Sequence, residues 1–263
     1  MNDDERNLWE AATNGDIDKV KELLSIPTID VNWGDEDYNR TAFYRACGHG
    51  RTEVVQLMLE DPRIDVNKIQ NEGLSPFYVA CQEGHLDVVK LLMKGDRVDV
   101  AKERDLKATP FFVACSHGRT EIVKLLAQDK RIDINKPEHQ GATPLNLACQ
   151  EGYYDIVQFL VKYDHLDINY SKHNGATPLF VAAQNGEIEI VKLLLAQTRY
   201  IDTTKTWKKR TALDQAKIMS ENGEHTRRQA NCPEIVKLLK LYEMNPKQTK
   251  RDLRRELRME GFI

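Results

Sequence analysis

The sequence predicts an all-α solenoid of about seven helix-turn-helix units with a 34-residue period, short β-turn tips and a C-terminal capping helix. Three columns of residues carry this prediction. A hydroxyl column recurs at Thr41, Ser75, Thr109, Thr143, Thr177 and Thr211. A glycine column recurs at Gly50, Gly84, Gly118, Gly152 and Gly186, and a column of small side chains at Cys47, Cys81, Cys115, Cys149 and Ala183. Because all three columns keep one spacing, the period defines the fold.

One unit shows why each repeat should contain two helices. The hydroxyl of Thr143 can cap a helix, and Pro144 suits the first helical position because it lacks an N–H. Apolar residues then recur at i, i+3 and i+4 until Gly152, which can end the helix in the left-handed conformation. A second amphipathic helix is expected from about Asp155. A unit this short cannot bury its own apolar face, so neighbouring units must stack.

These residues resemble the ankyrin family. The segment from Gly141 to Gly152 is similar to the family motif G-x-T-P-L-H-x-A-A-x-x-G, and residues 155–160 are similar to its second-helix signature. The resemblance covers roughly residues 5–242 and implies a non-enzymatic scaffold or adaptor. It further implies that another protein binds to the turn tips and to the concave groove formed by the first helices.

The sequence departs from the family pattern in three ways. The loop after the second helix is one residue longer than in the usual 33-residue repeat. The motif glycine before the cap is replaced by Asn39, Lys107 and Lys209, which we expect to loosen those turns. The motif histidine is replaced by Tyr44, Tyr78, Phe112, Asn146, Phe180 and Asp214.

We expect a single domain over residues 1–263, with modified repeats at its ends. An N-terminal capping repeat is predicted at 5–36, five regular repeats at 37–206, and a last repeat at 207–242 with an inserted surface loop at 220–232. A basic capping helix is predicted at 243–263. Stacked repeats need such modified ends because the outermost faces meet water.

Composition narrows the function classes. Hydrophobic residues make up 41% and charged residues 30% of the chain, which is typical of a folded protein, and no apolar run is long enough to span a membrane. No apolar leader follows Met1, so we expect a cytoplasmic or nuclear protein. We also expect it to be a monomer. Residues 1–204 carry 23 basic and 33 acidic residues, whereas residues 205–263 carry 15 and 8. The two parts should therefore attract different partners.

The sequence offers no catalytic or metal-binding constellation. Four cysteines occupy equivalent positions in successive repeats, too far apart for disulfides, and we interpret them as small packing residues. Cys232 falls in the inserted loop, either as a reactive thiol or, in our preferred interpretation, as an unremarkable one. The pairs Cys47–His49 and Cys115–His117 are two residues apart on a helix and do not share a face. We therefore predict no enzyme activity, cofactor, metal or small-molecule substrate.

The resemblance assigns candidate partner-binding residues. The predicted turn tips are Tyr38, Arg40, Glu72, Leu74, Leu106, Ala108, Gln140 and Asn174. The predicted groove residues are His49, Gln82, Glu83, Ser116, His117, Gln150, Glu151, Gln184 and Asn185. Tyr38, Leu74 and Leu106 are apolar or aromatic where water is expected, which makes them candidate anchors. The groove is polar and mildly acidic, so a partner with basic or amide groups would complement it.

Two features keep alternative interpretations open. The aromatic column Trp9, Tyr44, Tyr78, Phe112 and Phe180 either packs between neighbouring first helices or forms the floor of the groove. The basic C-terminal segment is either a solvated capping helix or a site for nucleic acid or anionic lipid; its cations are Lys247, Lys250, Arg251, Arg254, Arg255 and Arg258.

Overall fold

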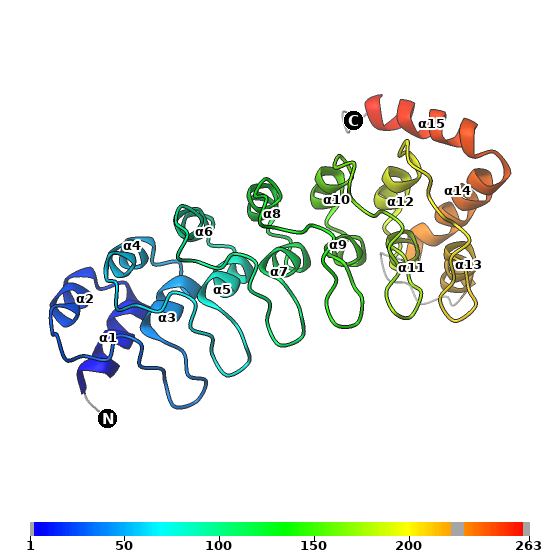
Figure 1. Ribbon diagram of the computed structural model, residues 1–263. Coiled ribbons are helices and arrows are strands. Elements are labelled where there is room, and N and C mark those ends of the chain that lie inside the picture. The colour runs from blue at the N-terminus through cyan, green and yellow to red at the C-terminus, as the bar shows by residue number, and fades with distance from the viewer. Residues whose placement is uncertain (1–2, 222–228, 260–263) are drawn as a thin grey trace. The chain divides into compact units, whose positions relative to one another are not determined.

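The computed structural model describes residues 3–221 and 229–259 (Figure 1). The chain forms two compact units, Met1–Asp133 and Ile134–Ile263. Each unit is built from helix pairs joined by long hairpin loops, and all the regular elements of the described residues are helices. The predicted all-α repeat fold is confirmed.

The first unit contains four helix pairs. First helices contact first helices (α1 with α3, α3 with α5, α5 with α7), and second helices contact second helices in the same order, so two rows form (Figure 1). The elements are α1 (Asp3–Asn14), α2 (Ile17–Leu24), α3 (Ala42–Gly48), α4 (Thr52–Glu60), α5 (Pro76–Glu83), α6 (Leu86–Met93), α7 (Pro110–Ser116) and α8 (Thr120–Leu126).

The second unit contains three further pairs and a final helix. Its first helices, α9, α11 and α13, stack on one another, and α15 contacts α12 and α14. The elements are α9 (Pro144–Glu151), α10 (Tyr154–Leu160), α11 (Pro178–Gln184), α12 (Ile188–Leu195), α13 (Ala212–Glu221), the 3₁₀ turn η1 (Gln229–Asn231), α14 (Cys232–Met244) and α15 (Pro246–Met259).

The hydroxyl column caps the first helices as predicted. Thr41, Ser75, Thr109 and Thr177 each accept a hydrogen bond from the backbone N–H three residues later, at 3.0–3.1 Å. Thr143 and Thr211 accept the same bond at 3.3 Å and 3.2 Å, and there a polar side chain three residues later also reaches back to the cap. Asn146 Oδ1 accepts from the N–H of Thr143 at 2.9 Å, and Asp214 Oδ2 from that of Thr211 at 3.1 Å.

The glycine replacements keep the turn geometry of the motif. Gly73, Gly141 and Gly175 have positive φ angles of 78°, 80° and 92°, and their counterparts Asn39 and Lys107 have φ angles of 58° and 60°. The replacements thus keep the left-handed conformation, because the hairpin imposes it on whichever residue is present. A side chain with a Cβ pays about 1–2 kcal/mol for that conformation.

Replacing Lys107 by glycine should therefore stabilise the first unit. Relief of the left-handed strain outweighs the entropy that glycine adds to the unfolded chain, and the free energy of unfolding should rise by about 0.5–1 kcal/mol. Urea denaturation measures the change. Lys107→Ala is the matched control because it removes the same charge but keeps the Cβ. An equal gain in both variants would show that charge, not strain, is responsible.

Asparagine side chains join neighbouring repeats along the loop layer. Asn67 Nδ2 donates to the carbonyl of Arg97 at 2.7 Å, and its Oδ1 accepts from the N–H of Asp99 at 2.8 Å. Asn32 in the first unit, and Asn135 and Asn169 in the second, make the same pair of hydrogen bonds to the next repeat. Each asparagine thereby fixes the spacing between two loops.

Removing one of these side chains should weaken the stack measurably. Asn67→Ala loses two hydrogen bonds to the next repeat, and the free energy of unfolding of the first unit should fall by about 1–2 kcal/mol. The exposed Asn14→Ala serves as the control and should change it by less than about 0.5 kcal/mol. A loss at Asn67 no larger than the control would contradict this role of the asparagines.

Arginines in the same loops hold the ends of the preceding second helices. Arg63 donates to the carbonyls of Leu24 at 2.6 Å and Ile26 at 3.1 Å, and Arg97 donates to the carbonyl of Leu59 at 2.7 Å. Asp61 orients Arg63 through an ion pair of 2.6 Å. The hydrogen bond from Arg63 lowers the pKa of Asp61 below its usual 3.8. The charged form of Asp61 therefore stabilises the packing of this loop on the preceding repeat.

This lowered pKa predicts a pH-dependent effect of Asp61→Asn. Because the folded pKa lies below the unfolded one, the charge stabilises the fold above about pH 4, and this contribution is lost as the pH falls through the folded pKa. At pH 7 the substitution should cost less than about 1 kcal/mol, since Arg63 is partly exposed. Urea denaturation at pH 7 and at about pH 2 should show the difference vanishing at low pH. A difference that persists in acid would contradict the ion-pair explanation.

The cysteines are packing residues throughout the described chain. Cys47, Cys81, Cys115 and Cys149 are fully buried, and burial raises the pKa of each thiol. The prediction that Cys232 lies in a loop is wrong, because Cys232 begins α14 and is also fully buried. Residues 222–228 of the predicted insertion lie outside the described residues.

The terminal helix α15 covers the ends of α12 and α14 through apolar and basic side chains. Leu253 and Leu257 are buried on its inner face. Arg254 Nε donates to the carbonyl of Ala196 at 2.7 Å, and Lys250 Nζ donates to that of Arg199 at 3.0 Å. These side chains bind the carbonyls at the end of α12, as the loop arginines do at the ends of other second helices. The contacts agree with the prediction of a capping helix.

Candidate protein-binding surface

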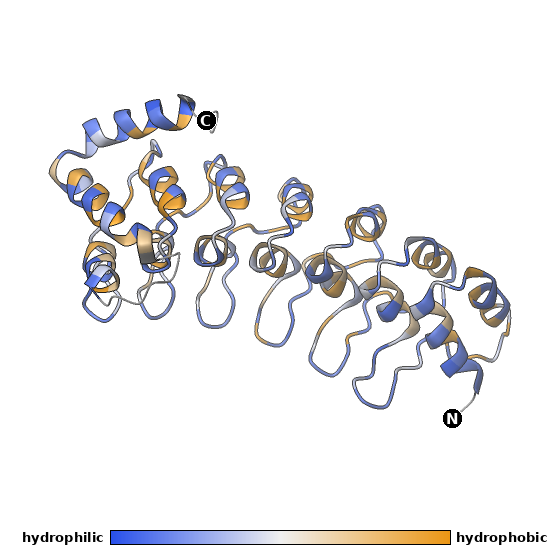
Figure 2. Ribbon diagram, turned by 180° about the vertical axis from the view of Figure 1, so that it is seen from behind, coloured by the Kyte–Doolittle hydropathy of each residue, from blue (hydrophilic) through white to orange (hydrophobic). Residues whose placement is uncertain are grey.

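The hairpin tips of the first unit expose two apolar side chains. Tyr38 is 45% exposed and Leu106 is 44% exposed, and the equivalent Glu72 is also exposed. Neighbouring tips are joined through backbone, because the N–H of Asn71 donates to the carbonyl of Tyr38 at 2.8 Å. The first unit thus presents a row of hairpin tips, whose loops are visible in the ribbon of Figure 2.

Two predicted tip residues are not accessible. Leu74 is only 9% exposed and Ala108 only 7%, so neither can anchor a partner. Both directly precede a capping hydroxyl, and Ala142 and Ala176 at the same position are buried as well. The chain must turn inward here to place the cap, which directs the preceding side chain into the core. The expectation that Leu74 faces water is therefore wrong.

Arg40 orders the first tip. Its guanidinium lies 4.6 Å from the ring centre of Tyr38, and its Nε donates to Asp35 Oδ2 at 2.7 Å. Asp35 also accepts from the N–H of Tyr38 at 2.8 Å. Burial alone would raise the pKa of Asp35, but these hydrogen bonds outweigh it and lower the pKa. Tyr38 is consequently held in place before any partner arrives, which reduces the entropy lost on binding.

A pocket of about 240 Å³ opens beside this tip. Trp9 and Trp33 line it together with Arg6, Glu10, Asp35, Glu36, Asp37 and Arg40. Trp9 is fixed by a 2.9 Å hydrogen bond from Nε1 to the carbonyl of Arg40. Arg40 is neutralised by Asp35, whereas Glu36 and Asp37 are exposed. The guanidinium of Arg45 already lies 4.6 Å from the centre of the Trp9 ring. The exposed carboxylates beside the indoles would therefore be the main attraction for a further cationic side chain.

The predicted groove residues of the first unit lie at the C-terminal ends of its first helices. His49, Glu83 and His117 are exposed, and Gln82 and Ser116 are half-buried. Gln82 Nε2 donates to Glu83 Oε1 at 2.9 Å, and the Ser116 hydroxyl lies 2.9 Å from Nδ1 of His117. Burial and the neighbouring Arg45 and Arg51 lower the pKa of His49. A neutral imidazole at pH 7 makes this a polar surface that can both donate and accept hydrogen bonds.

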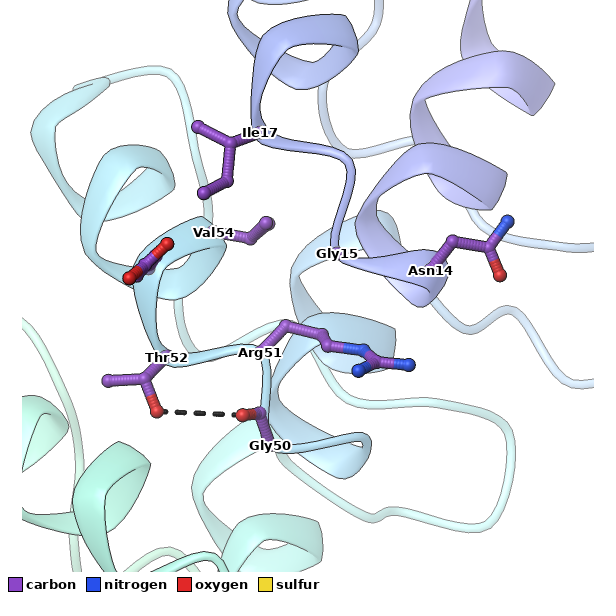
Figure 3. Close-up of a pocket in the computed structure, with 8 residues that line it drawn as sticks. Asn14, Gly15, Ile17, Gly50, Arg51, Thr52 and Val54 are labelled. Carbon is purple, nitrogen blue, oxygen red and sulfur yellow. Dashed lines mark hydrogen bonds between the residues drawn. The ribbon is translucent and has the colours of Figure 1, made fainter.

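The residue after the glycine that follows each first helix packs between repeats. Figure 3 shows Arg51 extending beside Gly15 in a pocket of about 310 Å³. Its Nε donates to the carbonyl of Thr13 at 2.9 Å, and Arg119 makes the same bond to Gln82. His85 Nε2 lies 3.0 Å from the carbonyl of Gly48, so it too joins two repeats. This pocket therefore belongs to the scaffold.

The second unit carries the remaining predicted residues. Gln140 and Asn174 are exposed at its tips, and Gln150, Glu151, Gln184 and Asn185 are half-buried at its helix ends. Lys172 Nζ donates to Gln150 Oε1 at 3.0 Å, and burial lowers the pKa of this lysine. Here the surface consists of amide and charged groups without an apolar anchor among the predicted residues.

The aromatic column is mostly packing. Tyr44, Tyr78 and Phe180 are 7%, 2% and 1% exposed, whereas Trp9 and Phe112 are half-buried. Burial raises the pKa of Tyr44 to about 12, and its hydroxyl hydrogen-bonds Gln70 of the next hairpin. Burial likewise raises the pKa of Tyr78, which bonds Arg104. The structure thus favours packing between repeats over an exposed aromatic floor.

Sequence reasoning missed two surface features. The first is Trp33, which lines the pocket beside the first tip, and the second is the basic hairpin around Trp207. Both lie in tip segments whose sequences differ from those of the other repeats, so the repeat pattern did not align them. The repeat spacing could have found the second feature, because 34 residues after Asn174 comes Lys208, which therefore belongs to the exposed tip column. The hairpin closes with two 2.9 Å backbone hydrogen bonds between Trp207 and Arg210.

Residues 3–221 and 229–259 contain no cluster of three or more metal-ligating side chains. None of the helices in this part of the chain combines the length and apolar character that a membrane span requires.

The fold and its tips define a class of all-α repeat proteins whose hairpins project from paired helices. The family model of ankyrin repeats matches residues 8–104, 96–172 and 164–252, and the chain belongs to the ankyrin repeat family. Ankyrin repeat domain-containing protein 7 of Homo sapiens is 44% identical over 57 residues. That alignment spans 22% of this chain and 22% of the relative. Ankyrin repeats are in general modules for protein–protein interaction.

Proposed function

We propose that this protein is a non-enzymatic scaffold or adaptor that binds a partner through its hairpin tips and the groove-side ends of its first helices. The exposure of Tyr38 and Leu106 on otherwise polar tips carries the proposal. Apolar side chains held in place at a solvent-facing site are typical binding anchors. The scaffold acts as a monomer in the cytoplasm or nucleus, in keeping with five unpaired cysteines.

The chemistry of the first tip narrows the partner. The pocket of Trp9 and Trp33, with exposed Glu36 and Asp37 at its rim, supports a partner that presents a lysine or arginine side chain. The amides and imidazoles of the groove would pair with the partner's backbone. The second candidate, nucleic-acid or lipid binding by the C-terminal helix, has less support, because Lys250 and Arg254 already bind backbone carbonyls.

Affinity purification with the whole chain, followed by calorimetry on the purified pair, tests the proposal. A direct complex should form with the affinity of a standard interface. The variant Glu36→Gln with Asp37→Asn should weaken it, and Glu121→Gln, on the exposed side of α8, should not. If no captured protein binds directly, or if the chain instead turns over a captured molecule, the proposal fails.

A further inference from the structure

The tip of the last hairpin concentrates positive charge. Lys208, Lys209 and Arg210 are exposed, and the half-buried Trp207 precedes them. Lys205 lies two residues earlier, and its Nζ donates to the carbonyl of Asn169 at 2.7 Å. Within the part of the chain that the structure describes, the side chains of Lys209 and Arg210 form no ion pair. Their charges are therefore available to a partner.

The backbone of this tip is strained in a way that glycine would relieve. Lys208 and Lys209 have positive φ angles of 49° and 64°. Two consecutive residues of this kind form the two-residue hairpin turn for which Asn-Gly is strongly preferred. Gly141 and Gly175 occupy the position of Lys209 in the two preceding repeats. Lysine at both positions is thus unfavourable for folding, and strain of this kind is typical of functional sites.

Trp207 holds the strained tip in one orientation. Its ring centre is 5.7 Å from that of Phe180, which anchors the hairpin to α11. The ammonium of Lys208 lies 4.6 Å from the centre of the Trp207 ring. Lysine on an indole is held in place but keeps its charge. The tip therefore presents an ordered cationic surface, with Lys208 in the same column as Tyr38 and Leu106.

We propose that the hairpin tip Lys208–Arg210 binds an acidic segment of a protein partner through carboxylate groups. This inference rests on the proposed function, because it treats the last tip as one more contact point of the scaffold. Carboxylates accept hydrogen bonds from ammonium and guanidinium groups, and Arg210 can bind one in a bidentate fashion. A protein ligand fits better than a nucleic acid, since nucleic-acid affinity comes from neutralising many phosphates together, and this tip presents three exposed cations.

The substitution Lys208→Asn with Lys209→Gly separates binding from stability. It installs the preferred turn and removes two charges, so the melting temperature should rise by about 2–6 °C while affinity for an acidic peptide falls about tenfold. The control Lys208→Arg with Lys209→Arg keeps charge and strain and should preserve both properties. The probe is a short acetylated peptide of aspartate and glutamate, and its asparagine–glutamine counterpart should not bind. Amide NMR of the whole chain reports where the peptide binds.

Opposite changes in stability and affinity would support the inference, since misfolding lowers both. Unchanged peptide affinity in the Asn-Gly variant, or amide shifts away from residues 205–210, would overturn it. So would an oligonucleotide that binds the same tip more tightly than the peptide at equal charge. These outcomes leave the proposed function intact if the wild-type complex still depends on Glu36 and Asp37. If that complex does not form, in contrast, the proposed scaffold function is itself contradicted.

Discussion

Replacing Phe77 by alanine is expected to lower the free energy of unfolding by about 3–5 kcal/mol. Phe77 is 1% exposed on α5, in the middle of the first unit. Truncation removes a large apolar side chain and leaves a cavity that the stacked helices cannot fill without shifting. It would be one of the most damaging single changes in this unit.

Urea denaturation followed by circular dichroism and tryptophan fluorescence measures this loss. Because each repeat contacts only its neighbours, the first unit should melt at a lower urea concentration, and the fluorescence of Trp9 and Trp33 should report it. Ile69→Ala, at a site that is 39% exposed, is the control and should cost less than about 1 kcal/mol. A loss at Phe77 below that of the control would contradict the stacked core.

The double substitution Tyr38→Ala with Leu106→Ala is expected to weaken partner binding at least about thirtyfold. Both side chains are exposed on fixed tips of the same unit, where truncation removes contact area without opening the core. The melting temperature should therefore stay close to that of the wild type. The loss should appear mainly as faster dissociation.

Calorimetry and surface plasmon resonance on the purified complex measure the effect. Tyr200→Ala is a matched control, because Tyr200 is 70% exposed but lies in the loop after α12 of the second unit and not in a hairpin tip. Affinity that is unchanged in the tip variant, or reduced equally in the control, would show that the tips are not the binding site.

The local elements of the fold could be predicted because each depends on a few neighbouring residues. A hydroxyl, a proline and a glycine at fixed spacing determine where a first helix begins and ends, and Thr143, Pro144 and Gly152 all behave as expected. The capping role of α15 followed from Asn245–Pro246 and the spacing of Leu253 and Leu257 in the same way. The ankyrin resemblance added the stacking order.

Exposure within the tips could not be predicted reliably because it depends on how the hairpin folds back on the helix. Leu74 and Leu106 are both leucines in tip segments, two positions apart in the repeat, yet Leu74 is buried beside a capping residue and Leu106 projects into water. Likewise, the residue types at 107 and 209 did not show that both lysines keep the left-handed conformation of the motif glycine. The loop arginines and asparagines were missed because their partners are backbone carbonyls of another repeat.

Hydrogen–deuterium exchange of the complex tests the central claim most directly, because it locates the partner without any substitution. Binding should protect backbone amides at residues 36–40 and 104–107 and at the C-terminal ends of α3, α5 and α7. Amides of the second helices and of the asparagine-linked loops should exchange as in the free chain. Protection confined to those second helices and loops would contradict a binding surface formed by the tips.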